Sequence, residues 1–160
     1  TDYLDDLYIC DGQGAGPYNN FLGDCRIEYL APNGAGASTQ WTPSAGANFE
    51  CVDEAAPDAD TTYINSSTAG QKDLYALTNL ITSAGTIYGV QTVLSDRKDD
   101  AGLRTVKSAI ATGGLESNGA NVNLADTYAY QLDIFTAKPG GGVWTVGDVN
   151  SASAGAELVA

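Results

Sequence analysis

Residues 86–112 read TIYGVQTVLSDRKDDAGLRTVKSAIAT, and two alternating runs within them decide the fold class. In the first run, residues 87–95, β-branched and aromatic side chains recur at every second position, which is the period of a β-strand. The second run, residues 103–111, has the same period. The residues between the runs are charged and end in Gly102, which predicts a loop. We therefore expect a long β-hairpin that is covered by a second layer.

The rest of the chain carries further strand patterns separated by residues that favour turns. They predict strands over residues 2–10, 25–30, 49–52, 61–65, 72–77, 120–124, 127–135 and the last six residues. Residues 31–36, APNGAG, are expected to end the second of these strands as a turn. The stretch TYAYQLDIF, residues 127–135, predicts a core strand. Its buried face is expected to carry Tyr128, Tyr130, Leu132 and Ile134.

Near the C-terminus the pattern changes to that of a short helix. Thr145 is placed to cap this helix, and Trp144 before it is placed to act as a hydrophobic staple. Together these patterns predict an all-β fold, an antiparallel β-sandwich of jelly-roll-like form with one short helix near the C-terminus.

Composition and charge exclude several classes of function. The 160 residues are 43% hydrophobic and only 17% charged, and seven basic residues against twenty acidic ones give a net charge of −13. Such a chain repels the phosphates of nucleic acids and of anionic membranes. No apolar run reaches the roughly 20 residues that span a bilayer. Because histidine is absent, the chain has no Ser-His-Asp or Cys-His catalytic set and no histidine metal site.

The domain organisation is predicted from the glycine-rich stretch that begins at Asp11. We expect residues 1–24 to be the final strand of a preceding sandwich domain plus a linker, and residues 25–160 to be the β-sandwich domain. The chain has no methionine and opens on Thr1, so it is expected to be processed or to be part of a longer protein. The cysteines Cys10, Cys25 and Cys51 show no CxxC spacing. Both buried thiols and one disulfide with one cysteine left over fit this pattern.

Four aromatic residues are candidate platforms for stacking against a glycan, because ring faces bind the C–H patches of sugars. They are Trp41, Trp144, Tyr18 and Tyr63. For Trp41 the alternative is a structural one, in which the ring covers the hydrophobic core. For Trp144 the alternative is the staple described above.

A second candidate site is the acidic stretch of residues 53–60, DEAAPDAD. Its carboxylates, Asp53, Glu54, Asp58 and Asp60, could hold calcium through oxygen ligands, although the spacing of an EF-hand is missing. The alternatives are a solvated loop and a pair of catalytic carboxylates. No cofactor is expected apart from this calcium ion.

Several segments in order resemble a family of virion proteins from tailed bacteriophages, over its C-terminal part. The segments are DDLYICDG, FLGDCRIEYLAPNGAG, STQWTPSAG, VDEAAPDADTTYINSSTAGQKDLY, IYGVQTVLSDRKDDAG and VWTVGDVNSASAGAEL. The first of them is similar to the final strand of a laminin-G or concanavalin-like sandwich that precedes this module in longer relatives. The resemblance implies a place in a virion, and it implies no catalytic residues.

These observations lead to three hypotheses of function. The first is a non-enzymatic phage structural protein, an exposed head or tail appendage that decorates the particle or contacts the host surface. Its partners would be other virion proteins and copies of itself. The second is a carbohydrate-binding module for host recognition. The third is glycan cleavage by two carboxylates, such as Asp53 and Asp99, and the sequence offers no spacing in its support.

Overall fold

The structure is a computed structural model that describes residues 12–14 and 19–160. The strand predicted over residues 2–10 lies outside the described residues, as do Cys10 and Tyr18. In the described part, the elements in chain order are β1 (Pro32–Thr39), β2 (Thr42–Pro43), the 3-10 helix η1 (Asn48–Cys51), β3 (Ile64–Asn65), β4 (Lys72–Leu77), β5 (Val90–Asp96), β6 (Thr105–Thr112), β7 (Leu115–Asn118), β8 (Val122–Asn123), β9 (Ala129–Phe135), α1 (Val146–Asn150) and β10 (Ser153–Leu158).

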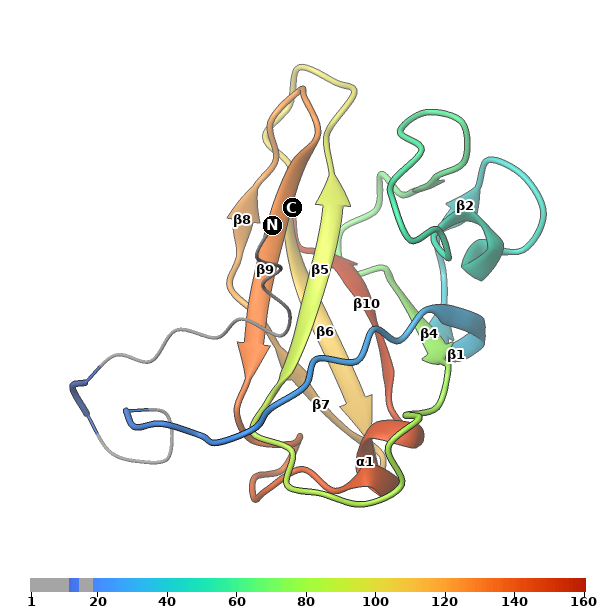
Figure 1. Cartoon of the computed structure of the whole chain (residues 1–160). Coiled ribbons are helices and arrows are strands. Elements are labelled where there is room, and N and C mark those ends of the chain that lie inside the picture. The colour runs from blue at the N-terminus through green and yellow to red at the C-terminus, as the bar shows by residue number, and fades with distance from the viewer. Residues whose placement is uncertain (1–11, 15–18) are drawn as a thin grey trace, which may run out of the picture.

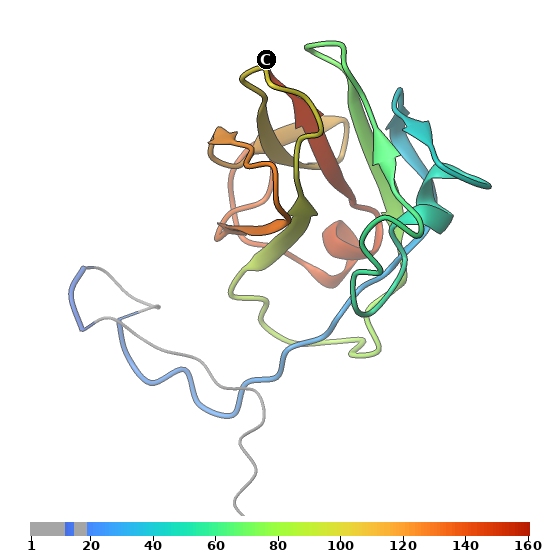
Figure 2. The ribbon, with the colours of Figure 1, turned by 90° about the horizontal axis from the view of Figure 1, so that it is seen from above.

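The strands form an antiparallel β-sandwich. The larger layer is six-stranded, in the order β1-β4-β10-β6-β7, with β8 paired to β6. The smaller layer is the pair β5-β9, and β2 with β3 forms a separate two-stranded ribbon. Figure 1 shows β5 and β9 side by side in front of β6 and β10, and Figure 2 shows the two layers from above. The predicted all-β sandwich with one short helix near the C-terminus is therefore confirmed.

The predicted hairpin of residues 86–112 is wrong, although both of its strands exist. β5 pairs with β9 over its whole length, and β6 pairs with β10, β7 and β8. Both edges of β6 are thus occupied within the larger sheet. The charged loop between β5 and β6 does not turn within one sheet, because it carries the chain from one layer of the sandwich to the other. This crossing leaves β5 in a sheet of only two strands.

Three local predictions in the N-terminal half are also wrong. Residues 25–30 form no strand, and this segment is held instead by Glu28, whose carboxylate accepts a 2.8 Å hydrogen bond from the amide of Ile81. Residues 32–39 form strand β1 rather than a turn. Here Gly36 lets β1 approach β4 closely, because a Cβ atom would overlap the carbonyl of Leu74. Residues 48–51 form the 3-10 helix η1 instead of a strand.

The hydrophobic core lies between the two layers and at one end of the sandwich. One buried cluster joins Ile110, Phe135, Trp144, Val149 and Ala152. A second buried cluster joins Val106, Ala156 and Leu158, and the half-buried Trp41 packs against it. The first cluster contains Trp144, which precedes α1, and Val149, which lies within α1. The N-terminal staple predicted for Trp144 is therefore confirmed through its companion in the helix, Val149.

No helix in the described part is both long enough and apolar enough to cross a membrane.

Candidate interaction site

The outer face of the β5-β9 sheet is the candidate site, because it exposes large apolar side chains. The predicted buried face of β9 points outward: the exposed fractions are 64% for Tyr130, 57% for Leu132 and 67% for Ile134. On β5, Val93 is 55% exposed and lies directly opposite Leu132. The assignment of Tyr128, Tyr130, Leu132 and Ile134 to the core is thus wrong. A hollow of about 200 Å³ at one end of the face is lined by Tyr88, Gly89, Gln91, Ile134 and Thr136.

The inner face of β9 carries two polar side chains, Gln131 and Asp133, beside the core residue Phe135. The carboxylate of Asp133 accepts hydrogen bonds from the Ser108 hydroxyl at 2.6 Å and from the Ala120 amide at 3.0 Å. Gln131, which is buried, donates to the carbonyl of Ala120 at 3.1 Å. Burial alone would raise the pKa of Asp133, but the hydrogen bonds from Ser108, Ala120 and Gln131 outweigh it and lower that pKa. A polar network between the layers therefore turns the apolar side of β9 toward the surface.

The outer face of the larger sheet has the opposite character. Glu157 on β10 lies between two lysines of the neighbouring strands, at 3.6 Å from Lys72 and 3.1 Å from Lys107. Lys72 also reaches Glu116 on β7 at 2.9 Å. This ladder of cross-strand ion pairs is typical of a sheet face that meets water. Of the two outer faces, only that of β5-β9 is apolar.

A cluster of Asp60, Arg97 and Tyr128 borders the apolar face where β5 ends and β9 begins. Arg97 donates to Oδ1 of Asp60 at 2.9 Å, and the Tyr128 hydroxyl donates to the same oxygen at 2.9 Å. The guanidinium also lies 5.3 Å from the centre of the Tyr128 ring, which is cation–π distance. The hydrogen bond from Arg97, followed by that from Tyr128, lowers the pKa of Asp60. These contacts fix the acidic loop of residues 53–60 beside the small sheet.

The predicted glycan platform is not one surface. Trp144 is only 3% exposed and donates from Nε1 to the carbonyl of Phe135 at 2.8 Å, so its ring is part of the core and the platform role is wrong for it. Trp41 is half-buried against the second core cluster and donates to the carbonyl of Gln71 at 3.0 Å. Tyr63 is 42% exposed, and Tyr18 lies outside the described residues. The exposed rings of Tyr128 and Tyr130 were missed, because their strand pattern predicted burial.

The predicted calcium ligands are divided between two sets of partners. The Thr62 hydroxyl lies 2.8 Å from Oε1 of Glu54 and 2.9 Å from Oδ2 of Asp58. Asp60 instead faces Arg97, and the side chain of Asp53 is exposed. Among residues 12–14 and 19–160, no group of three or more acidic or cysteine side chains is arranged to hold a metal ion. Of the cysteines, Cys25 and Cys51 are free thiols.

Asp96, the last residue of β5, has a carboxylate oxygen that is buried without a hydrogen-bond partner in the structure. Burial raises the pKa of this group above its ordinary value of 3.8. The folded chain therefore holds the proton more tightly than the unfolded chain does. It follows that the ionised carboxylate destabilises the fold, increasingly as pH rises from the unfolded pKa through the higher folded pKa.

We therefore expect Asp96→Asn to raise the free energy of unfolding at pH 7 by about 1 kcal/mol, since an amide carries no charge to desolvate. At about pH 3 the gain should disappear, because Asp96 of the unmodified chain is then largely protonated in both the folded and the unfolded state. Urea denaturation at the two pH values measures this, with the exposed Asp99→Asn as the control that should change little. A less stable Asp96→Asn variant at pH 7 would show that the carboxylate accepts a bond in the folded protein.

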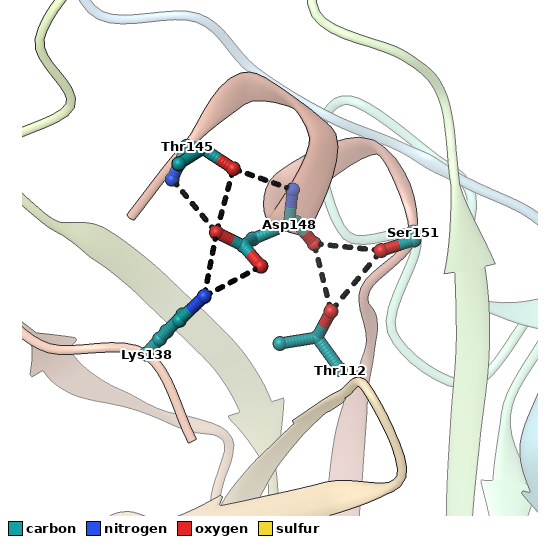
Figure 3. Close-up of polar contacts among 5 residues, drawn as sticks. All are labelled: Thr112, Lys138, Thr145, Asp148 and Ser151. Atoms are coloured by element: carbon teal, nitrogen blue, oxygen red, sulfur yellow. Dashed lines mark hydrogen bonds and ion pairs between the residues drawn. The ribbon is translucent and has the colours of Figure 1, made fainter. Parts of the chain in front are cut away.

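The polar groups at the opposite end of the sandwich are occupied by a helix cap (Figure 3). The Thr145 hydroxyl accepts from the amide of Asp148 at 3.1 Å, and the Thr145 amide donates back to the Asp148 carboxylate at 3.0 Å. Lys138 binds the same carboxylate at 3.0 and 3.1 Å. The hydrogen bond from Thr145, followed by that from Lys138, lowers the pKa of Asp148. A hollow of about 240 Å³ beside these groups is thus bordered by side chains that already serve the cap.

All seven basic side chains also have partners within the chain. Six of them are in ion pairs, namely Arg26, Lys72, Arg97, Arg104, Lys107 and Lys138. The seventh, Lys98, donates to the carbonyl of Gly102 at 2.7 Å. With a net charge of −13, the chain suits an uncharged contact better than an anionic ligand.

Comparison with family models, with curated proteins and with solved structures finds no match for this chain.

Proposed function

We propose that the chain is a non-enzymatic structural module of a tailed-phage virion, an exposed head or tail appendage whose contact surface is the outer face of β5-β9. The observation that carries the proposal is that face: four large apolar side chains, each more than half exposed, on one layer of an acidic sandwich. Contiguous exposed apolar surface of this kind marks sites of contact with other molecules. The hollow of about 200 Å³ at one end of the face is smaller than the roughly 300–1,000 Å³ of usual ligand pockets, so the face suits an assembly protein better than a catalyst.

Three carboxylates that are engaged within the fold support the non-enzymatic part of the proposal. Asp133 and Asp148 accept hydrogen bonds from neighbouring strands, from a lysine or from a helix cap. Asp73, which is fully buried, accepts four hydrogen bonds, and three of them hold a loop. In each case the lone pairs that would attack a substrate or take up a proton are bound within the fold.

The virion part of the proposal rests on the resemblance of the ordered segments to phage virion proteins. The partners would then be other virion proteins and further copies of this chain, on the outside of the particle. Mass spectrometry of gradient-purified particles should detect the chain at a constant ratio to the major capsid protein, and gold-labelled antibody should locate it on the head or on the tail. Its presence only in the lysate supernatant would contradict the proposal.

A carbohydrate-binding role in host recognition is the second candidate, and the exposed rings of Tyr128 and Tyr130 favour it. Because the basic side chains are engaged, the glycan would be neutral. A glycan array separates the two functions. The Tyr130→Ala variant should abolish retention of a neutral oligosaccharide if the face binds sugar, whereas the assembly role predicts no retention by either form.

A further inference from the structure

We propose that the outer face of β5-β9 packs against the same face of a second copy of the chain, about a two-fold axis that runs parallel to the strands. This inference rests on the proposed assembly function and names the partner at its contact surface. Figure 1 looks onto the face, and Figure 2 shows that its layer lies on the outside of the sandwich.

The composition of the face suits an identical partner. The outward residues form three cross-strand pairs: Gln91 with Ile134, Val93 with Leu132, and Ser95 with Tyr130. None of them is charged, so that two such faces can meet without burying a charge. Each copy has a net charge of −13, so two copies repel each other, and an uncharged face is a surface through which they can still make contact.

The register of the pairs suggests how the two faces fit. In each pair the β9 residue is the larger, with Tyr130 opposite Ser95 as the extreme case. A two-fold axis parallel to the strands places β9 of one copy over β5 of the other at the same level. Large side chains then lie over smaller ones, with Leu132 over Val93 at the centre. Such an isologous contact closes after two copies, and aligned stacking is a usual geometry for sheets.

The edges of the small sheet also lack several of the devices that keep strands from pairing with other chains, although the charged residues Asp96 and Asp133 point inward. Its seven pairs run without a register shift, whereas the pairing of β1 with β4 contains two. Within the described residues no third strand joins β5 or β9, and neither strand contains proline or lysine. A sheet of only two strands is marginally stable in water, and strands without such protection tend to associate with other chains.

The size and charge of the contact predict its strength. Seven residues at about 3.4 Å make strands of roughly 24 Å, so a face roughly 10 Å wide offers only a few hundred Å² per copy. Stable dimers bury about 800 Å² per copy. The isolated chain should therefore associate weakly, and salt should strengthen the contact by screening the acidic surfaces. In a particle, the high local concentration of copies would maintain the contact.

Sedimentation velocity of the whole chain from 10 µM to 1 mM, at low and at high NaCl, tests the proposal. The average mass should rise toward that of a dimer, more so in high salt. Leu132→Glu should weaken association at least tenfold, because it buries a charge against Val93 of the second copy. The matched control is Ile81→Glu, at an 88% exposed position outside the sheet, which should associate like the unmodified chain.

A mixture of variants tests the geometry itself. Val93→Lys alone should also associate weakly, but an equimolar mixture of Leu132→Glu and Val93→Lys should recover association, because the two new charges face each other in the mixed dimer. A chain that stays monomeric at 1 mM, an equal loss with Ile81→Glu, or a mixture without recovery would each overturn the proposal. A monomer that binds a neutral oligosaccharide through Tyr130 would assign the face to sugar instead. These results are independent of whether the chain is found in particles.

Discussion

Replacing Asp73 by alanine is expected to lower the free energy of unfolding by about 3–5 kcal/mol. The side chain, on strand β4, is fully buried. Its Oδ1 accepts from the amides of Gln40 at 2.5 Å and Trp41 at 3.1 Å. Its Oδ2 accepts from the side chain of Asn48 at 2.5 Å and from the hydroxyl of Tyr75 at 2.9 Å. Alanine would remove the acceptor that these four donors share, and it would leave the buried hydroxyl of Tyr75 without a partner.

Urea denaturation followed by circular dichroism measures this loss, and two variants identify its cause. Tyr75→Phe removes one of the four donors and should lower stability by only about 1 kcal/mol. Burial, with the nearby charge of Asp73, raises the pKa of Tyr75, so its hydroxyl stays a donor at neutral pH. Asp99→Asn, at an exposed loop position, should change little. An Asp73→Ala variant as stable as Asp99→Asn would show that Asp73 does not hold the loop of residues 40–51.

The positions of the strands could be predicted from the sequence better than the pairing between them. The alternating pattern of residues 72–77 coincides with β4, and the second run of the opening stretch, residues 103–111, overlaps most of β6. The pairing of β5 with β9, however, joins residues about 40 positions apart. Alternation shows that a segment is extended, but it does not identify the distant strand that pairs with it. A charged loop such as residues 97–102 can turn within a sheet or cross between layers.

The candidate site escaped prediction for a physical reason. In β9 the apolar side carries Tyr130 and Leu132, and the opposite side carries Gln131 and Asp133, so the usual rule sends the first side inward. The rule fails because Ser108 on β6 satisfies Asp133 between the layers. Departures of this kind from local rules are expected at functional surfaces. The deciding contact is with a residue 25 positions away, which the local pattern of residues 127–135 does not contain.

Trp144→Ala is expected to lower the free energy of unfolding by about 3–5 kcal/mol, the usual loss when a buried tryptophan is truncated. The ring of Trp144 belongs to the buried cluster that contains Phe135 and Val149. The backbone of Trp144 pairs with that of Ile87. It thereby connects the approach to β5, the end of β9 and the helix α1. The resulting cavity would lie where both layers meet the helix, so the variant should also lose part of the tertiary signal in near-ultraviolet circular dichroism.

Two further variants separate packing from surface roles at the tryptophans. Trp144→Phe keeps an aromatic ring but removes the 2.8 Å hydrogen bond to the Phe135 carbonyl, so its loss should be smaller than that of Trp144→Ala. Trp41→Ala should also lose less, because that ring is only half-buried. If Trp144→Ala instead kept its stability and lost binding to a surface or a glycan, the ring would have to reach solvent. The helix cap would then have to open without unfolding the sandwich, and the hydrogen bond from Trp144 to β9 would have to break at little cost.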